Sequence, residues 1–183
     1  VIATHWYTFY EAIKVSNVSI TLVCLSTGAF FASILEPLFY KRKIIWYEVA
    51  FGLLAIIGIA IIFKVETQFK TGIYLAILSA FLSALFSVLN GKYAKEYNPN
   101  VIAFYELISG VIFLSIVLYF TDKFSPSFFQ ITLQDFIWLF LLSSICTAYA
   151  FSASIKVMKF LSPFTVMLTI NLEPIYGIIL AIL

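Results

Sequence analysis

Residues 165–177, TVMLTINLEPIYG, decide how this chain folds. They lie in a mostly apolar run, 162–183, of about 22 residues, which is long enough to cross a bilayer core of roughly 30 Å. A carboxylate facing lipid at this depth would cost several kcal/mol, so we expect Glu173 to face protein or a water-filled cavity. On a helix, one face carries four polar side chains: Thr165, Thr169, Glu173 and Tyr176.

A proline follows Glu173 directly. Pro174 has no backbone hydrogen to donate and clashes one turn back, so we expect the carbonyl of Ile170 to be free and the helix to bend. A polar stripe, a buried acid and a loosened backbone together indicate a solute site. We therefore expect Glu173 to bind a solute or a coupling ion. The alternative is structural: a hydrogen-bonded or protonated carboxyl group that holds helices together.

Composition places the chain in a membrane. Hydrophobic residues make up 63% of it and charged residues 11%, and the mean hydropathy is +1.06. Soluble domains contain about 45–50% apolar and about 25% charged residues. The apolar runs are long and uninterrupted, unlike the alternating strands of about ten residues that build β-barrels. We therefore predict an all-α, polytopic helical membrane protein.

Seven hydrophobic segments are separated by short polar connections. The connections after the second, fourth and sixth segments carry seven basic residues, against four in the other three, so the positive-inside rule places the first set in the cytoplasm. Both ends look like cuts through a longer protein, so we expect a fragment. The segments are 1–13, 18–40, 47–63, 72–91, 101–121, 135–155 and 162–183.

Two segments carry a stripe of small and polar residues. Such residues let helices approach closely, and their hydroxyl groups bond across helices. We expect most of them to pack helices together and a minority to line a cavity. In the fourth segment the stripe is Gly72, Ala76, Ser79, Ser83, Ser87 and Asn90, and in the sixth it is Ser143, Thr147, Ala150 and Ser154.

Other polar residues lie within or beside the apolar segments. Glu106 is about one and a half turns inside the fifth segment, where it is either a cavity acid or reaches the interface. We expect Glu36 to form an interfacial salt bridge with Lys41. His5 has no obvious partner, and we expect it to be packed or interfacial.

An internal repeat relates the second segment to the seventh. When Lys14 is aligned with Lys159, residues 14–35 lie over 159–180 without gaps, with a polar entry, a matching length and a polar centre in both. The two segments are five apart, and an odd offset gives them opposite orientations. This is the arrangement of an inverted repeat in a transporter.

The stretches 28–44, 72–110 and 148–180 resemble the EamA-type family of the drug/metabolite transporter superfamily. The resemblance implies ten helices in two inverted five-helix halves, of which this chain would hold the third to the ninth. Residues 1–71 would complete the first half, and residues 72–183 would form most of the second.

The resemblance also implies a secondary transporter with its substrate cavity between the halves. By position, eight residues are candidates for substrate binding: Ser83, Tyr105, Glu106, Thr147, Thr169, Asn171, Glu173 and Tyr176.

We predict a carrier that exports an amino acid or a related metabolite by alternating access. The first alternative is a proton-coupled antiporter of drugs and lipophilic cations, and the second is a non-transporting membrane scaffold. A single histidine, no HExxH motif and no paired acids at helical spacing argue against an enzyme and against a metal site. The cysteines, Cys24 and Cys146, lie in apolar segments and are expected to be core residues.

The expected partners follow from this function. They are a small-molecule substrate and the lipid bilayer. Two further partners are left undecided: a proton or another coupling ion, and a second copy of the chain in a homodimer. We predict no cofactor and no nucleic-acid partner, because the basic residues lie in short loops. The expected location is the inner (plasma) membrane of the cell, crossed several times.

Overall fold

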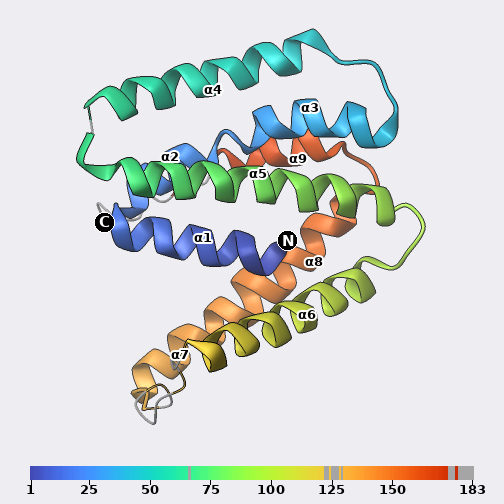
Figure 1. The fold of residues 1–183 in the computed structure, drawn as a ribbon. Helices are drawn as coiled ribbons and strands as arrows, with labels where there is room; N and C mark the ends of the chain where they lie inside the picture. The colour runs from blue at the N-terminus through green and yellow to red at the C-terminus, as the bar shows by residue number, and fades with distance from the viewer. Residues whose placement is uncertain (66, 122–123, 125–127, 129, 173–175, 177–183) are drawn as a thin grey trace.

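The computed structural model describes residues 1–65, 67–121, 124, 128, 130–172 and 176, and these contain helices and no strands. Figure 1 shows long helices that run back and forth beside one another. The elements are α1 (Ile2–Val15), α2 (Val18–Leu25), α3 (Gly28–Tyr40), α4 (Trp46–Val65), the 3₁₀ turn η1 (Thr67–Phe69), α5 (Lys70–Tyr93), α6 (Pro99–Phe120), α7 (Leu133–Leu141), the π-helix η3 (Leu142–Tyr149), α8 (Ala150–Val157) and α9 (Pro163–Ile170).

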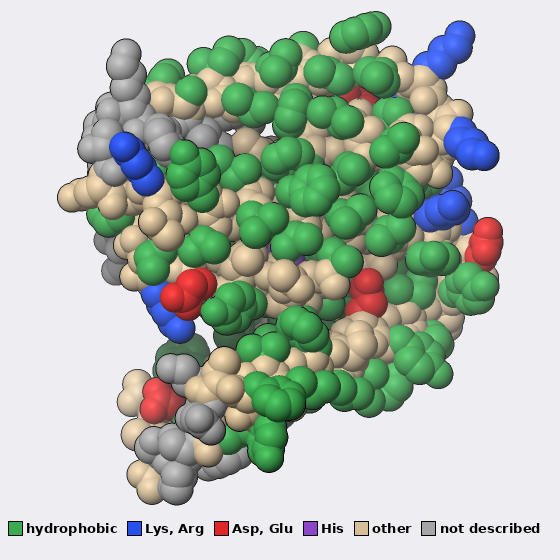
Figure 2. Space-filling view, in the orientation of Figure 1, with side chains coloured by type: hydrophobic (Ala, Val, Ile, Leu, Met, Phe, Trp, Pro, Cys, Tyr) green, Lys and Arg blue, Asp and Glu red, His purple; other side chains and the backbone are tan. Residues whose placement is uncertain are grey.

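The chain is an integral, multi-pass membrane protein, as its composition predicts. Four stretches of described helix are long and apolar enough to span a bilayer: Val18–Tyr40, Lys70–Tyr93, Pro99–Phe120 and Leu133–Val157. Figure 2 shows one side of the helical bundle. Hydrophobic side chains cover most of this surface between the two ends of the helices, and the Lys and Arg side chains lie near those ends. The connections that follow α3, α5 and α8 lie at one end of the bundle (Figure 1), and these are the three predicted to be cytoplasmic.

Helix α5 lies at the centre of the bundle and contacts α1, α2, α3, α8 and α9. Its small residues face these neighbours, and every member of the stripe predicted on 72–91 is buried. One apolar cluster joins α5 to α1 and α2 through Ile73, Ala12 and Cys24. Another joins it to α3 and α9 through Ala84 and Met167.

The internal repeat has a structural counterpart. The second segment is not one continuous helix, because Ser26 and Thr27 form a turn between α2 and α3. With Lys14 placed on Lys159, α2 coincides with α9 residue for residue, and each has eight residues. Both begin with a side-chain cap at the aligned position, where Asn17 accepts from Ile20 N–H and Ser162 accepts from Thr165 N–H.

The interruption after each of these two helices is also aligned. Asn171 and Leu172 form a turn after α9, as Ser26 and Thr27 do after α2. The N–H of Leu172 donates to the carbonyl of Thr169 at 3.1 Å, a bond one residue shorter than that of an α-helix. The irregularity thus begins at Asn171, before Pro174, which lies outside the described residues.

His5 has a partner that the sequence did not reveal. Its Nδ1 lies 2.9 Å from the carbonyl oxygen of Ser79 on α5 and 2.8 Å from the hydroxyl oxygen of the same residue. Because a carbonyl can only accept, Nδ1 carries the hydrogen. The Ser79 hydroxyl donates to the His5 carbonyl at 3.0 Å, so α1 and α5 are joined by reciprocal hydrogen bonds in a buried position.

We expect a close approach of α3 and α4 to depend on a glycine. A Cβ atom added to Gly52 would lie 2.7 Å from Cα and Cβ of Phe30, while at Gly58 on the same helix it would meet nothing within 4 Å. Gly52→Ala should therefore destabilise the protein by about 1–3 kcal/mol, because backbone must move. Gly58→Ala should be neutral or stabilise by up to about 1 kcal/mol. Thermal unfolding in detergent measures both variants, and equal melting temperatures would contradict this packing.

Candidate functional site

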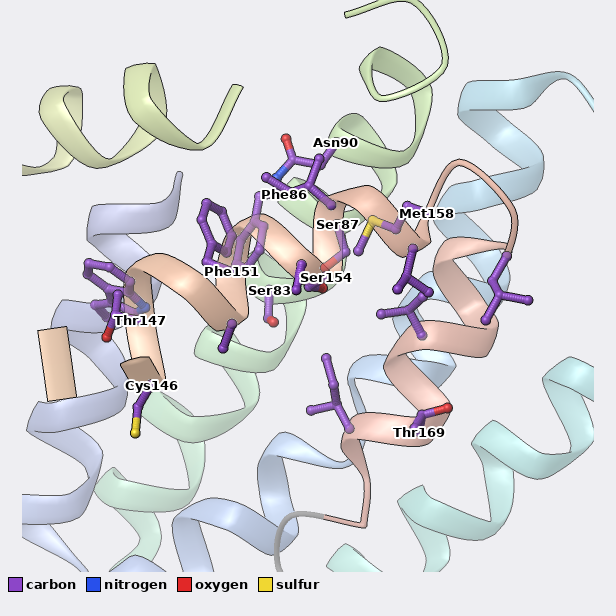
Figure 3. A pocket seen from close by; sticks show the side chains of 18 of the residues that line it. Ser83, Phe86, Ser87, Asn90, Cys146, Thr147, Phe151, Ser154, Met158 and Thr169 are labelled. Atoms are coloured by element: carbon purple, nitrogen blue, oxygen red, sulfur yellow. The ribbon is translucent and has the colours of Figure 1, made fainter. Parts of the chain in front are cut away.

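A cavity of about 510 Å³ lies beside the C-terminal half of α5. Its walls come from α1, α5, η3, α8 and α9 (Figure 3). The residues that line it are Trp6, Tyr10, Ser83, Phe86, Ser87, Asn90, Cys146, Thr147, Ala150, Phe151, Ala153, Ser154, Ile155, Val157, Met158, Leu161, Val166, Thr169 and Ile170.

Several hydroxyl groups in this cavity are free to bind a ligand. Within the described part of the chain, the hydroxyls of Ser83, Thr147 and Ser154 make no hydrogen bond. Two others are engaged, because Ser87 Oγ donates to the sulfur of Met167 at 3.4 Å and Thr169 Oγ1 donates to a backbone carbonyl at 2.9 Å. In Figure 3, Thr147 and Thr169 lie on either side of the serines. A polar solute would find unsatisfied donors and acceptors here.

Aromatic rings form the apolar part of the lining. Phe86 of α5 and Phe151 of α8 meet edge to face, with ring centroids 5.9 Å apart. Trp6 and Tyr10 of α1 add two larger rings one turn apart. Rings of this kind bury the apolar part of a ligand and can also hold a cation against their faces.

The described lining contains no charged side chain. The acid connected to it is Glu106 on α6, whose Oε2 accepts a hydrogen bond of 2.9 Å from Nδ2 of Asn90. Asn90 is buried and lines the cavity, while Glu106 stands behind it and is half-buried. Glu106 is thus hydrogen-bonded to a residue that lines the cavity but does not line it itself.

The structure brings three of the eight predicted site residues to this cavity: Ser83, Thr147 and Thr169. Glu106 reaches it through Asn90, and Asn171 is half-buried just beyond the lining. Tyr105 and Tyr176 are exposed outside the described lining. Glu173 lies outside the described residues, so its place at the site stays a prediction.

The sequence pointed to some lining residues and missed others. Ser87, Asn90 and Ser154 belong to stripes that were expected chiefly to pack helices. Trp6 and Tyr10 were not singled out, although aromatic residues four apart share one face of a helix. Nothing in the residue pattern predicted that η3, which presents Thr147 to the cavity, would be a π-helix. In this helix Ser143 and Ser144 both donate to the carbonyl of Phe140, and such widened turns often occur at functional sites.

A network of three charged side chains positions α9, which forms one wall of the cavity. Arg42 Nε donates to Glu36 Oε1 at 3.1 Å, and Arg42 Nη2 donates to Glu48 Oε2 at 2.8 Å. The other oxygen of Glu36 accepts the backbone N–H of Phe164 in the first turn of α9 at 3.1 Å. One carboxylate thus joins α3 to the N-terminus of α9, where the helix dipole favours negative charge.

Glu36 forms a salt bridge, as predicted, but its basic partner is Arg42 and the predicted partner, Lys41, is wrong. Lys41 has φ 53° and is exposed, and this left-handed turn brings Arg42 instead to the carboxylate. Burial acts to lower the pKa of Arg42, but the hydrogen bond to Glu48 and the charge and hydrogen bond of Glu36 outweigh it. The pKa of Arg42 is consequently raised from its ordinary value, so the guanidinium stays charged at physiological pH.

Comparison with known proteins gives one match. The model of the EamA-like transporter family matches residues 70–183, which is more than half of the chain. No curated protein and no solved structure matches it.

Removal of the guanidinium should destabilise the protein. Arg42→Ala leaves the carboxylates of Glu36 and Glu48, each about 6% exposed, without their cation. Breaking a buried pair in this way costs about 3 kcal/mol, at the low end of the usual range because Arg42 itself is partly exposed. Lys43→Ala removes an exposed charge next to it and should change little. Melting temperatures in detergent test both, and a loss no larger for Arg42→Ala than for Lys43→Ala would contradict the role of the network.

Proposed function

The chain belongs to the EamA-like transporter family, and from this premise we propose that it is a secondary transporter that exports an amino acid or a related small metabolite by alternating access. The observation that carries the proposal is the cavity beside α5, with its free hydroxyl groups and aromatic walls. The family groups transporters rather than enzymes, which agrees with the expected absence of catalytic residues.

The size and position of the cavity support a solute site. Its volume of about 510 Å³ lies within the roughly 300–1,000 Å³ of small-molecule pockets. Helix α1 comes from the first predicted half of the protein, and α5, α8 and α9 come from the second. A cavity between halves can open to either side of the membrane in turn when one half rocks against the other.

The chemistry of the lining fits a compact solute with both polar and apolar parts. The hydroxyls of Ser83, Thr147 and Ser154 would orient its polar groups, while Phe86 and Phe151 would cover its apolar part. An amino acid or a related metabolite has both kinds of surface. The hydrogen bonds would supply specificity, because a mismatched solute would leave these groups unpaired.

The aligned turns give alternating access a mechanical basis. Residues 26–27 and 171–172 form turns directly after α2 and α9, at equivalent positions of the repeat, and both turns lie within apolar segments of the sequence. Helices bend most readily where their regular hydrogen bonds are interrupted. We place the bending points of the transport cycle at these two turns.

A second candidate function is a proton-coupled antiporter of lipophilic cations. The aromatic walls favour it, because Trp6, Tyr10 and the two phenylalanines could hold a cation by cation–π contact. An antiporter of this kind would show competition between protons and cations and little stereoselectivity. The metabolite carrier should instead select one or a few compounds.

Counterflow in liposomes tests the cavity as the transport path. Thr147→Phe should fill part of the cavity and lower uptake of the transported compound at least about tenfold, since a displaced solute loses both contact and orientation. Ala148→Phe, at an exposed neighbouring position outside the lining, should leave uptake unchanged. A pooled panel of labelled amino acids and metabolites supplies the substrate. Wild-type uptake by a folded Thr147→Phe variant would place the transport path elsewhere.

Glu173→Gln tests the predicted role of the intramembrane acid. If Glu173 binds a proton or a cationic group, the variant should lose uptake or lose its dependence on pH, because a glutamine cannot change charge. The readout is counterflow measured at several pH values beside the wild type. Unchanged transport with an unchanged pH profile would rule out this role and leave the structural alternative.

A further inference from the structure

A second cavity, of about 410 Å³, lies where the start of α6 meets the end of α8. It shares no lining residue with the cavity beside α5. Its lining residues belong to the connections after α5 and α8 and to the helix ends beside them, and these connections lie at one end of the bundle (Figure 1). Its lining consists of Asn98, Pro99, Asn100, Lys156, Lys159 and Phe160.

The charge of this cavity is positive and uncompensated. Lys156 and Lys159 are both exposed, and neither forms a salt bridge with a carboxylate in the described part of the chain. The lining contains no acid. The two lysines line one cavity, and two like charges near each other repel, so an anion bound there would be stabilised by both ammonium groups.

The amide groups in the lining are arranged as donors. Ser152 Oγ on α8 donates to Oδ1 of Asn100, which fixes the orientation of that amide and leaves its Nδ2 without an acceptor in the described residues. Oδ1 of Asn98 accepts a hydrogen bond of 2.9 Å from the backbone N–H of Asn100. The Nδ2 of Asn98 therefore also has no acceptor among the described residues. Both amides stand at the N-terminus of α6, where the helix dipole also favours an anion.

Exposed apolar side chains continue from the cavity along the hydrophobic flank. Phe160 is 83% exposed, and Val101 of α6 is 49% exposed. A positively charged pocket with amide donors, beside exposed apolar surface at the end of membrane-spanning helices, matches a molecule with an anionic head and an apolar tail.

We propose that this cavity binds the phosphate headgroup of an anionic phospholipid. Lys156 and Lys159 contact the phosphate oxygens, the amides of Asn98 and Asn100 add hydrogen bonds, and the acyl chains lie against Phe160 and its apolar neighbours. The apolar flank favours a lipid over free phosphate, which would leave that surface uncovered. This site is separate from the transported solute and does not depend on the proposed transport function.

The test is a lipid titration of the purified protein in a neutral detergent, followed by melting temperature and by native mass spectrometry. Phosphatidylglycerol should raise the melting temperature and remain bound, while phosphatidylcholine and inorganic phosphate should do neither. Lys156→Gln with Lys159→Gln should weaken phosphatidylglycerol binding about 30-fold. Replacement of both lysines by arginine should preserve binding, because the charges are kept.

The matched control is Lys43→Gln with Lys92→Gln. It removes the same charge from the same end of the bundle, outside the cavity, and should bind phosphatidylglycerol as the wild type does. Melting without lipid reports whether each variant folds, and if the Lys156/Lys159 variant does not, Lys159→Gln alone should weaken binding about fivefold. Equal loss in the control, or unchanged binding in the cavity variant, would overturn the site. Stabilisation by inorganic phosphate alone would overturn the lipid as its ligand.

Discussion

The small-residue face of α5 is the contact on which the rest of the fold depends. A bilayer offers no hydrophobic drive to bring helices together, so close packing and hydrogen bonds must do so. Glycine, alanine and serine on α5 let α1, α2, α3 and α9 approach it closely. At Gly72 even a Cβ atom would come within 2.5 Å of Cβ of Ser16, which shows how little space separates the backbones. The cavity opens along the same face, where Ser83, Ser87 and Asn90 continue the stripe.

The second constraint is that buried polar groups must be satisfied within the protein. The described residues meet it with pairs that join distant parts of the sequence. His5 and Ser79 exchange hydrogen bonds between α1 and α5, and Arg42 holds Glu36, which in turn caps α9. Among the described residues no fully buried side-chain polar atom lacks a partner. The hydroxyls of Ser83, Thr147 and Ser154, which are free in the described part of the chain, line the cavity beside α5, where a ligand or water can reach them.

The internal repeat explains why the second and seventh apolar segments share the same arrangement of helix cap, helix length and turn. Asn17 and Ser162 cap helices of equal length, and a turn follows each at the aligned position, although few residues are identical. Caps and turns depend on a few polar side chains at fixed places, whereas the apolar positions between them tolerate exchange. In Figure 1 the two segments run in opposite directions. The repeat is thus carried by helix caps and turns, which a sequence alignment scores weakly because few of the aligned residues are identical.

The sequence by itself determined the helical class, the membrane setting and the positions of the seven apolar segments, because hydrophobic run length and composition are local properties. It also marked Ser83, Thr147 and Thr169 as residues on polar helix faces. Only the tertiary structure decided which faces meet: that Trp6 and Tyr10 line the cavity, that Arg42 replaces Lys41 beside Glu36, and that Asn90 links Glu106 to the cavity. The physical reason is that a helix fixes which residues share its own face, but the rotation and tilt of each helix against its neighbours follow from packing between segments far apart in the chain.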